Sequence, residues 1–192
     1  MSSAESTSPT APPSDAPQSA AACVRLSRSE DGAVITLTLD PPHRKQTVFD
    51  RLLMQGLDLA LAEVERDGRA QGLVLRGREA LHFCYGADVE AIAAIESAPQ
   101  AEELAREGQR VFQRLHRLSK SGGGRLVSVA AVGGPVPGGA CEVALACDWI
   151  VLADDPKSRF GLPEVKLGIL PGWGGCQRLP RRLGVPKALA AI

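Results

Sequence analysis

The sequence predicts an α/β fold built around a largely parallel sheet, and two observations support this. Short apolar segments of strand type alternate with segments of helical periodicity along most of the chain, which is typical of strands joined by helical crossovers. Glycine-rich loops stand where strands are expected to lead into helices. With 192 residues, 44% of them hydrophobic, the chain is long enough for one domain with a sizeable core.

The first half of the chain predicts a hairpin, a helix and a strand, in that order. Apolar residues at 24–26 and 34–39 indicate two short strands joined by an Asp-Gly turn. Residues 48–66 place apolar side chains at near-helical spacing, which predicts an amphipathic helix. The apolar run at 72–76 then predicts a third strand.

The second half repeats the order of strand, loop and helix. Asp88 closes a loop at 83–88 and is a candidate N-cap for the helix after it. The glycine-rich segment 133–139 separates a buried strand from another helix. The expected elements are helices at 89–95, 101–118 and 140–147, and strands at 125–132 and 149–153.

The two ends of the chain differ in composition from the rest. Residues 1–21 are mostly Ser, Ala and Pro, which predicts a disordered tail before one domain at 22–192. The tail has no Arg or Lys and no apolar core of a signal peptide, so no import or export signal is expected. Gly184-Val-Pro186 is typical of a helix start, yet only six residues follow, so we expect the domain to be incomplete at its C-terminus.

Charge and cysteine content exclude several classes of partner. The chain carries 22 basic and 22 acidic residues, so its bulk charge favours neither nucleic acid nor an anionic membrane. No apolar run approaches the roughly 20 residues of a membrane span. An odd number of cysteines without zinc-like spacing indicates structural thiols in a reducing, cytoplasmic compartment and no metal site. The five cysteines are Cys23, Cys84, Cys141, Cys147 and Cys176.

Two glutamates in glycine-rich loops are the candidate catalytic residues. Glu142 follows Gly138 and Gly139, and Glu164 stands in a loop with further glycines and prolines. Two neighbouring carboxyl groups can move protons, and glycines before a helix leave backbone N–H groups free to bind an oxyanion. The same residues also fit tight turns and a glutamate that favours the first turn of a helix.

The order of these motifs resembles the crotonase, or enoyl-CoA hydratase/isomerase, superfamily. The resemblance rests on four segments and covers residues 24–192, with the highest specificity in the second half. They are Phe83-x-x-Gly-Ala-Asp88, Gly138-Gly-x-x-Glu142, Phe160-Gly-Leu-Pro-Glu164 and Pro171-Gly-x-Gly-Gly175. The resemblance implies a spiral of ββα units that binds an acyl-CoA thioester, with no metal or redox cofactor.

By position in the motifs, the resemblance implies a role for each site residue. The amides of Tyr85 and Gly139 would bind the thioester oxygen, although Tyr85 stands where the family has a small residue. Glu142 and Glu164 would hold the water that adds to the double bond, near the amide of Gly172. The residues expected to contact substrate are Gly86, Ala87, Asp88, Gly138 and Trp173.

Retention of both glutamates favours enoyl-CoA hydratase chemistry, a lyase reaction of fatty-acid β-oxidation. The alternatives are an enoyl-CoA isomerase or another crotonase-type acyl-CoA enzyme, and an inactive fragment. The sequence especially resembles the hydratase part of a multifunctional fatty-acid oxidation α-subunit, which continues into a 3-hydroxyacyl-CoA dehydrogenase. That resemblance implies a trimer-based homo-oligomer at full length and a thiolase subunit as partner.

Other polar residues have simpler interpretations. Gly122-Gly-Gly124 predicts a flexible insertion rather than a phosphate loop. His82 is expected to be a partly exposed residue at a strand end. Arg178, Arg181 and Arg182 are interpreted as a solvated face, with a clamp on CoA as the alternative.

Overall fold

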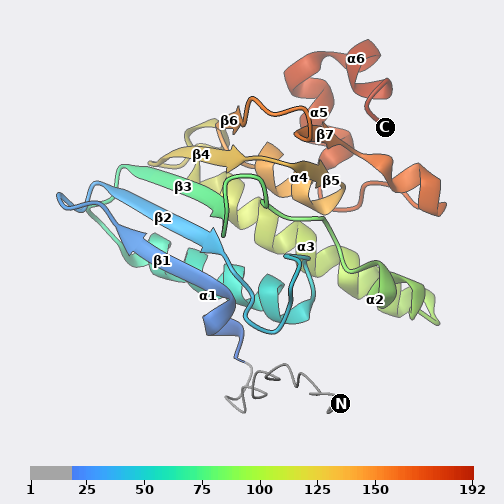
Figure 1. The fold of residues 1–192 in the computed structure, drawn as a ribbon, viewed down its shortest axis with the longest axis horizontal. Helices are drawn as coiled ribbons and strands as arrows, with labels where there is room; N and C mark the ends of the chain where they lie inside the picture. The colour runs from blue at the N-terminus through green and yellow to red at the C-terminus, as the bar shows by residue number, and fades with distance from the viewer. Residues whose placement is uncertain (1–18) are drawn as a thin grey trace, which may run out of the picture.

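The computed structural model describes residues 19–192 and contains a five-stranded sheet with helices packed on it (Figure 1). The strand order is β1-β2-β3-β4-β6, in which only the β1–β2 pair is antiparallel. The predicted α/β fold with a largely parallel sheet is confirmed. The strands are β1 (Val24–Arg28), β2 (Val34–Leu39), β3 (Gly72–Gly77), β4 (Val127–Val132) and β6 (Trp149–Leu152).

A second sheet pairs two short strands in parallel, β5 (Pro135–Pro137) and β7 (Arg159–Gly161). The sequence did not predict them, because each is three residues long and lies in a segment rich in turn-forming residues. The α-helices are α1 (Arg51–Arg66), α2 (Val89–Ala93), α3 (Ala98–Leu118), α4 (Gly139–Leu145), α5 (Gly175–Leu183) and α6 (Val185–Leu189). The 3₁₀ helices are η1 (Ala20–Cys23), η2 (Lys120–Gly122) and η3 (Pro163–Leu167).

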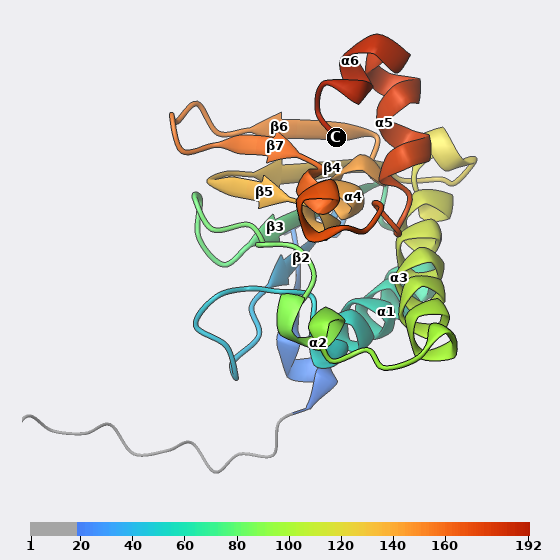
Figure 2. The same cartoon turned by 90° about the vertical axis from the view of Figure 1, so that its right-hand side faces the viewer.

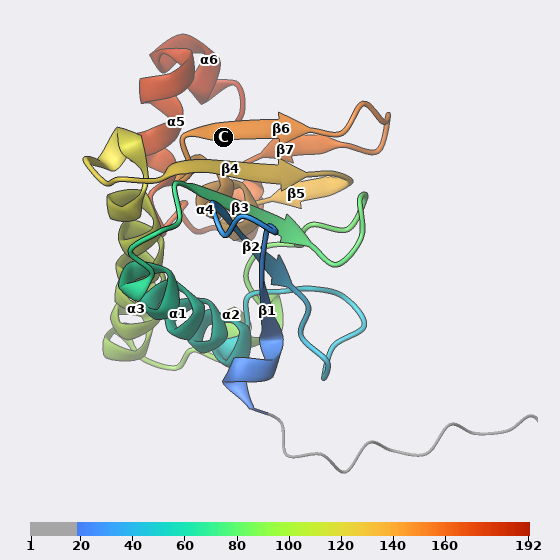
Figure 3. The same ribbon diagram turned by 90° about the vertical axis from the view of Figure 1, so that its left-hand side faces the viewer.

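The main core lies between the sheet and the two long helices. Figures 2 and 3 show α1 and α3 side by side on one face of the sheet, with α5 and α6 at its far end. Leu57 and Leu61 of α1 and Leu37 of β2 are fully buried. Each such side chain contributes roughly 1.5–3 kcal/mol when it leaves water. This packing forms the support on which the loops after the strands are held.

Helix boundaries differ from the prediction by up to three residues, most at the starts of α1 and α3, where the reasons are local. Helix α1 begins at Arg51 rather than at residue 48, because the Asp50 side chain accepts from Leu53 N at 2.9 Å and caps the helix. Phe49, just before the cap, forms a β-bridge with Ala87. Helix α3 begins at Ala98 rather than at 101, with a proline in its first turn.

Most of the expected disordered tail, residues 1–18, lies outside the described residues. Ala20 and Ala21, which the expected boundary assigned to the tail, belong to η1. This turn packs on α1, where a Cβ on Gly56 would lie 2.3 Å from the Ala20 oxygen. The predicted helix start near Pro186 is confirmed by α6. No helix within residues 19–192 combines the length and apolar character that a membrane crossing requires.

Candidate active site

Glu142 is held rigidly at the start of α4. Gly138 precedes this helix at φ 55°, a conformation that favours glycine, and Glu142 follows in the first turn. Its side chain is buried, and its Oε1 accepts from the backbone N–H groups of Trp173 at 2.7 Å and Gly175 at 2.8 Å. The sequence did not predict these two donors, because they come from a turn 31 and 33 residues further along the chain. Glu142 is thereby fixed in direction.

Glu164 lies on η3 and approaches the same helix start. A Cβ on Gly138 would be 3.1 Å from Glu164 Oε1, so the glycine leaves room for this carboxyl group. Glu164 is 8% exposed, and its buried Oε2 has no hydrogen-bond partner among residues 19–192. The structure therefore brings the two predicted glutamates to the N-terminus of α4, with one bound by amides and the other carrying a free oxygen.

Burial makes both carboxyl groups easier to protonate. Desolvation raises the pKa of Glu142 to about 7, with a further increase from the charge of Glu164, while the Gly175 and Trp173 amides oppose the shift. Desolvation also raises the pKa of Glu164. Neighbouring carboxyl groups in a dry site resist ionising together. The pair can therefore supply one acid and one base near neutral pH.

The structure corrects the role expected for Tyr85. Its backbone N–H donates to the Thr47 carbonyl oxygen at 2.8 Å, in the contact between the loop 83–88 and the segment before α1. An N–H already bonded in this way cannot bind a thioester oxygen. The prediction that the Tyr85 amide is free to bind an oxyanion is therefore wrong.

The amide of this loop that faces the start of α4 is that of Ala87. Phe49 N donates to Gly86 O at 2.7 Å and Asp88 N donates to Phe49 O at 3.2 Å, so Phe49 bonds the two residues flanking Ala87. In such a parallel bridge the N–H of the middle residue points to the opposite side. That side is the start of α4, where a Cβ on Gly139 would lie 3.4 Å from Ala87 N. Ala87 was expected only as a substrate contact, because the sequence carries no signal for its pairing with Phe49.

The amide pair of Ala87 and Gly139 stands beside the glutamates. A Cβ on Gly86 would be 3.5 Å from Gly139 N, so the small residues of both loops allow the two backbones to meet. Gly139 is the first residue of α4, where backbone N–H groups have no partner within the helix. Two adjacent amides of this kind can stabilise an oxyanion.

The turn at residues 172–175 has structural contacts beside the role expected for Gly172. The Gly172 carbonyl accepts from Gln109 Nε2 at 2.7 Å, which ties the turn to α3. No hydrogen bond from the Gly172 amide is found within residues 19–192, so its expected contact with water stays a prediction. The neighbouring amides of Trp173 and Gly175 bind Glu142 directly.

Trp173 belongs to the core and also forms a wall. Its ring packs edge-on against Phe112 at 5.3 Å and Phe49 at 6.2 Å between centroids, and its Nε1 donates to Leu104 O at 3.3 Å. A Cβ on Gly139 would lie 2.5 Å from the ring, so the indole covers the start of α4. One face of the indole lines a large cavity.

This cavity of about 810 Å³ lies between α1, α2 and α3. Its lining combines apolar and charged side chains. Asp88 lines it, but the Asp88 side chain caps α2 and pairs with Arg44, which gives it a structural role beside the expected substrate contact. The apolar lining residues are Phe49, Met54, Ala87, Ala91, Ile92, Leu104 and Trp173.

The predicted solvated face of arginines is wrong for Arg178 and confirmed for Arg181 and Arg182, which are exposed. Arg178 is partly buried and donates to Trp173 O and to Gln113 Oε1, each at 3.0 Å. Arg182 donates to carbonyl groups at the end of α4, among them Leu145 O at 3.3 Å. Both connect α5 to the rest of the fold.

The remaining polar residues largely follow their simpler interpretations. The described cysteines are free, and four are buried while Cys176 is exposed. His82 is exposed and pairs with Glu79 at 3.0 Å. Within residues 19–192 no group of three or more His, Cys, Asp or Glu could hold a metal ion.

Comparison with known proteins agrees with this architecture. Residues 29–192 match the enoyl-CoA hydratase/isomerase family. Fatty acid oxidation complex subunit alpha of Aliivibrio fischeri is 40% identical over 164 residues, and that of Shewanella amazonensis is equally similar. The match covers 85% of this chain but 23% and 22% of those relatives, so the chain spans less than a quarter of their length.

Solved structures give the same result for the fold. Pseudomonas aeruginosa DspI superposes with a TM-score of 0.76 at 30% identity, covering 88% of this chain and 64% of that one. An enoyl-CoA hydratase from Bacillus anthracis superposes with a TM-score of 0.77 at 26% identity, covering 88% and 62%. The expected crotonase-like fold is confirmed. The chain therefore belongs to the enoyl-CoA hydratase/isomerase family.

Proposed function

We propose that this protein is an enoyl-CoA hydratase that adds water in syn fashion to trans-2-enoyl-CoA. The observation that carries the proposal is the buried pair Glu142 and Glu164 beside the adjacent amides of Ala87 and Gly139. An enoyl thioester needs both parts, because water must be deprotonated while negative charge collects on the thioester oxygen.

The amides act on the thioester oxygen. Charge develops there when the hydroxyl group of water adds to the β-carbon, and two fixed N–H groups stabilise it without reorganising. The Ala87 amide is fixed by the bonds of its neighbours to Phe49. The acyl chain occupies the cavity lined by Ala87 and Trp173, whose apolar lining residues suit a hydrocarbon.

The glutamates act on water. The ionised glutamate accepts a proton from water while the water oxygen bonds to the β-carbon. The protonated glutamate gives its proton to the α-carbon. The raised pKa of each carboxyl group supports these roles of one base and one acid near neutral pH. The free buried oxygen of Glu164 supports a direct contact of that residue with water.

The test is hydration of crotonyl-CoA, followed by loss of the ultraviolet absorbance of the conjugated thioester. Glu142→Gln and Glu164→Gln are expected to lose activity, while Glu63→Gln, an exposed glutamate on α1, keeps it. Undiminished hydration in either site variant would contradict the two-glutamate mechanism. Migration of the double bond without hydration would favour the isomerase alternative, and no reaction of crotonyl-CoA at all would favour a non-catalytic fragment.

The relatives are named as subunits of a fatty acid oxidation complex. On this similarity we extend the proposal to fatty-acid β-oxidation, with a thiolase subunit as partner and a trimer-based homo-oligomer. Size-exclusion chromatography with light scattering, with and without a co-expressed thiolase subunit, would test both. A monomer that does not bind the thiolase would contradict this part without affecting the hydration chemistry.

A further inference from the structure

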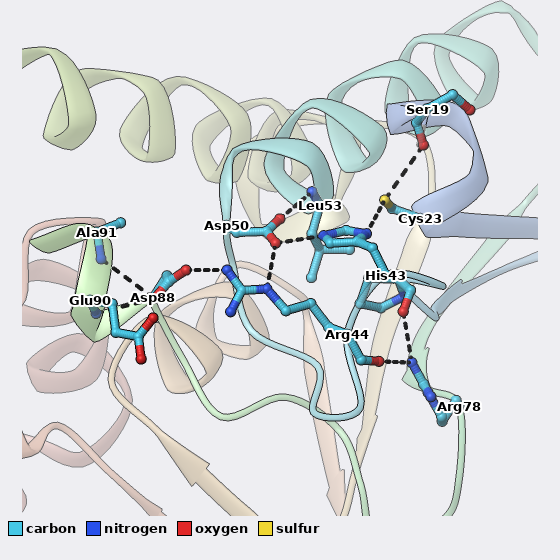
Figure 4. Close-up of polar contacts among 11 residues, drawn as sticks. Ser19, Cys23, His43, Arg44, Asp50, Leu53, Arg78, Asp88, Glu90 and Ala91 are labelled. Atoms are coloured by element: carbon cyan, nitrogen blue, oxygen red, sulfur yellow. Dashed lines mark hydrogen bonds and ion pairs between the residues drawn. The ribbon is translucent and has the colours of Figure 1, made fainter. Parts of the chain in front are cut away.

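We infer that Arg44 is a positioning residue for the Ala87 amide. Figure 4 shows its guanidinium group between the carboxylates of Asp50 and Asp88, which cap α1 and α2. Asp88 directly follows Ala87, so a contact that fixes Asp88 also restrains Ala87, whose N–H is the proposed oxyanion donor. Only the activity arm of the test rests on the proposed function.

The Asp50 side of the bridge is anchored to the core. Asp50 Oδ1 accepts from Leu53 N, and Oδ2 accepts from Arg44 Nε at 3.0 Å and pairs with His43 Nε2 at 2.6 Å. Burial raises the pKa of Asp50, but these hydrogen bonds outweigh it and hold the pKa below its usual value. The carboxylate is thus a fixed negative charge at the start of α1.

The Asp88 side of the bridge carries a short, exposed helix. Asp88 Oδ1 accepts from Glu90 N at 3.1 Å and Ala91 N at 3.4 Å, while Oδ2 pairs with Arg44 Nη2. Helix α2 has five residues, none of them buried. A helix so short and exposed gains little from packing. Its cap, and the bond from that cap to Arg44, therefore matter more to its position.

Arginine is suited to this bridge and lysine is not. The Nε and Nη2 atoms of one planar group reach two carboxylates at once, whereas an ammonium group is a single point charge. The Arg44 carbonyl accepts from Arg78 Nη2 at 3.2 Å, which holds the segment from its other side. With the bridge removed, the like charges of Asp50 and Asp88 would repel, and the loop with Ala87 would move away from Gly139.

Amide hydrogen exchange of the protein tests this without any substrate. Arg44→Lys is expected to speed exchange at residues 85–91 about tenfold or more, because a bridge of charged hydrogen bonds is lost. Exchange in α1 beyond its first turn is expected to stay unchanged. Arg28→Lys is the matched control, since Arg28 Nε also binds a turn-capping aspartate, Asp67 at 3.1 Å, far from the site.

Activity gives the second readout. In Arg44→Lys kcat for crotonyl-CoA is expected to fall about tenfold with KM changed less than about twofold, because the amide acts mainly on the transition state. Asp88→Asn, which keeps a capping side chain but loses the charge, should reproduce the exchange result if Arg44→Lys does not fold. Unchanged exchange at 85–91 in a folded variant would overturn the inference. If Arg44→Lys speeds exchange at 85–91 but the wild type does not hydrate crotonyl-CoA, the positioning role of Arg44 stands and only the hydratase proposal is contradicted.

Discussion

The two glutamates of the site are buried to a similar degree but held in opposite ways. Glu142 lies 2% exposed on α4 and its Oε1 accepts from two backbone amides. Glu164 lies 8% exposed on a single turn of 3₁₀ helix, and its Oε2 has no partner within the described residues. The first carboxyl group is part of the scaffold, and the second is left free for other hydrogen bonds.

The two glutamates are therefore expected to contribute differently to the stability of the fold. A buried acceptor that satisfies two N–H groups stabilises the fold, whereas a buried oxygen without a partner destabilises it. Residues that destabilise a fold while adding reactivity are typical of functional sites. Substitutions of Glu142 and Glu164 should therefore have similar effects on activity and different effects on the free energy of unfolding.

The largest expected effect is on activity, where the two glutamates act as one unit. Each of Glu142→Gln and Glu164→Gln should lower kcat by about 10²–10⁴, the usual contribution of general acid–base catalysis. The double variant should lose little more than the worse single variant, because neither carboxyl group works without the other. Steady-state kinetics on the four proteins checks this, and losses that multiply would show two independent roles.

The next effect is on stability, where the two should differ. Glu142→Ala leaves the Trp173 and Gly175 amides without their acceptor, which should cost about 2–6 kcal/mol at about 1–3 kcal/mol per buried donor. Glu164→Ala removes a poorly satisfied carboxyl group, so the free energy of unfolding should change by less than about 1 kcal/mol. Urea denaturation measures both, and equal losses would remove the contrast.

A third effect is on the pH dependence of stability. The pKa of Glu142 rises from 4.5 to about 7 on folding, so the folded state binds the proton more tightly than the unfolded chain. Its contribution is full below pH 4.5 and is lost as the pH rises through about 7. The loss is about 3 kcal/mol at about 1.4 kcal/mol per pKa unit.

The control for this prediction is Glu142→Gln, which cannot titrate at this position. Its unfolding free energy should fall less steeply than that of the wild type between pH 4.5 and 7. Glu164→Gln should also flatten the curve, because the pKa of Glu164 is raised too. Parallel curves for the wild type and both variants would show that neither shift exists.

The sequence predicted the carboxyl groups and the helix start of this site better than the backbone N–H groups that act as hydrogen-bond donors. Glu142, Glu164 and Gly139 followed from motifs, because glycines before a helix and a carboxyl group in its first turn are local patterns. The Ala87 amide, by contrast, depends on which way an extended segment turns when it pairs with Phe49. The Trp173 and Gly175 donors depend on a turn folding back over α4. Contacts between distant segments leave no periodicity in the sequence. The prediction that the Tyr85 amide is free is wrong for this reason, because its bond to Thr47 joins two such segments.

The smallest expected effect concerns Arg178, the arginine whose charge acts on Glu142. Arg178 donates to Trp173 O and its charge lowers the pKa of Glu142, while the charge of Glu164 raises it. Arg178→Gln should therefore raise the Glu142 pKa and shift the corresponding limb of the pH–rate profile upward by less than about one unit. Arg181→Gln, an exposed arginine on the same helix, is the matched control. If both variants leave the profile unchanged, the backbone amides of Trp173 and Gly175 alone oppose the burial of Glu142, and the difference between the two glutamates originates in main-chain geometry rather than in charge.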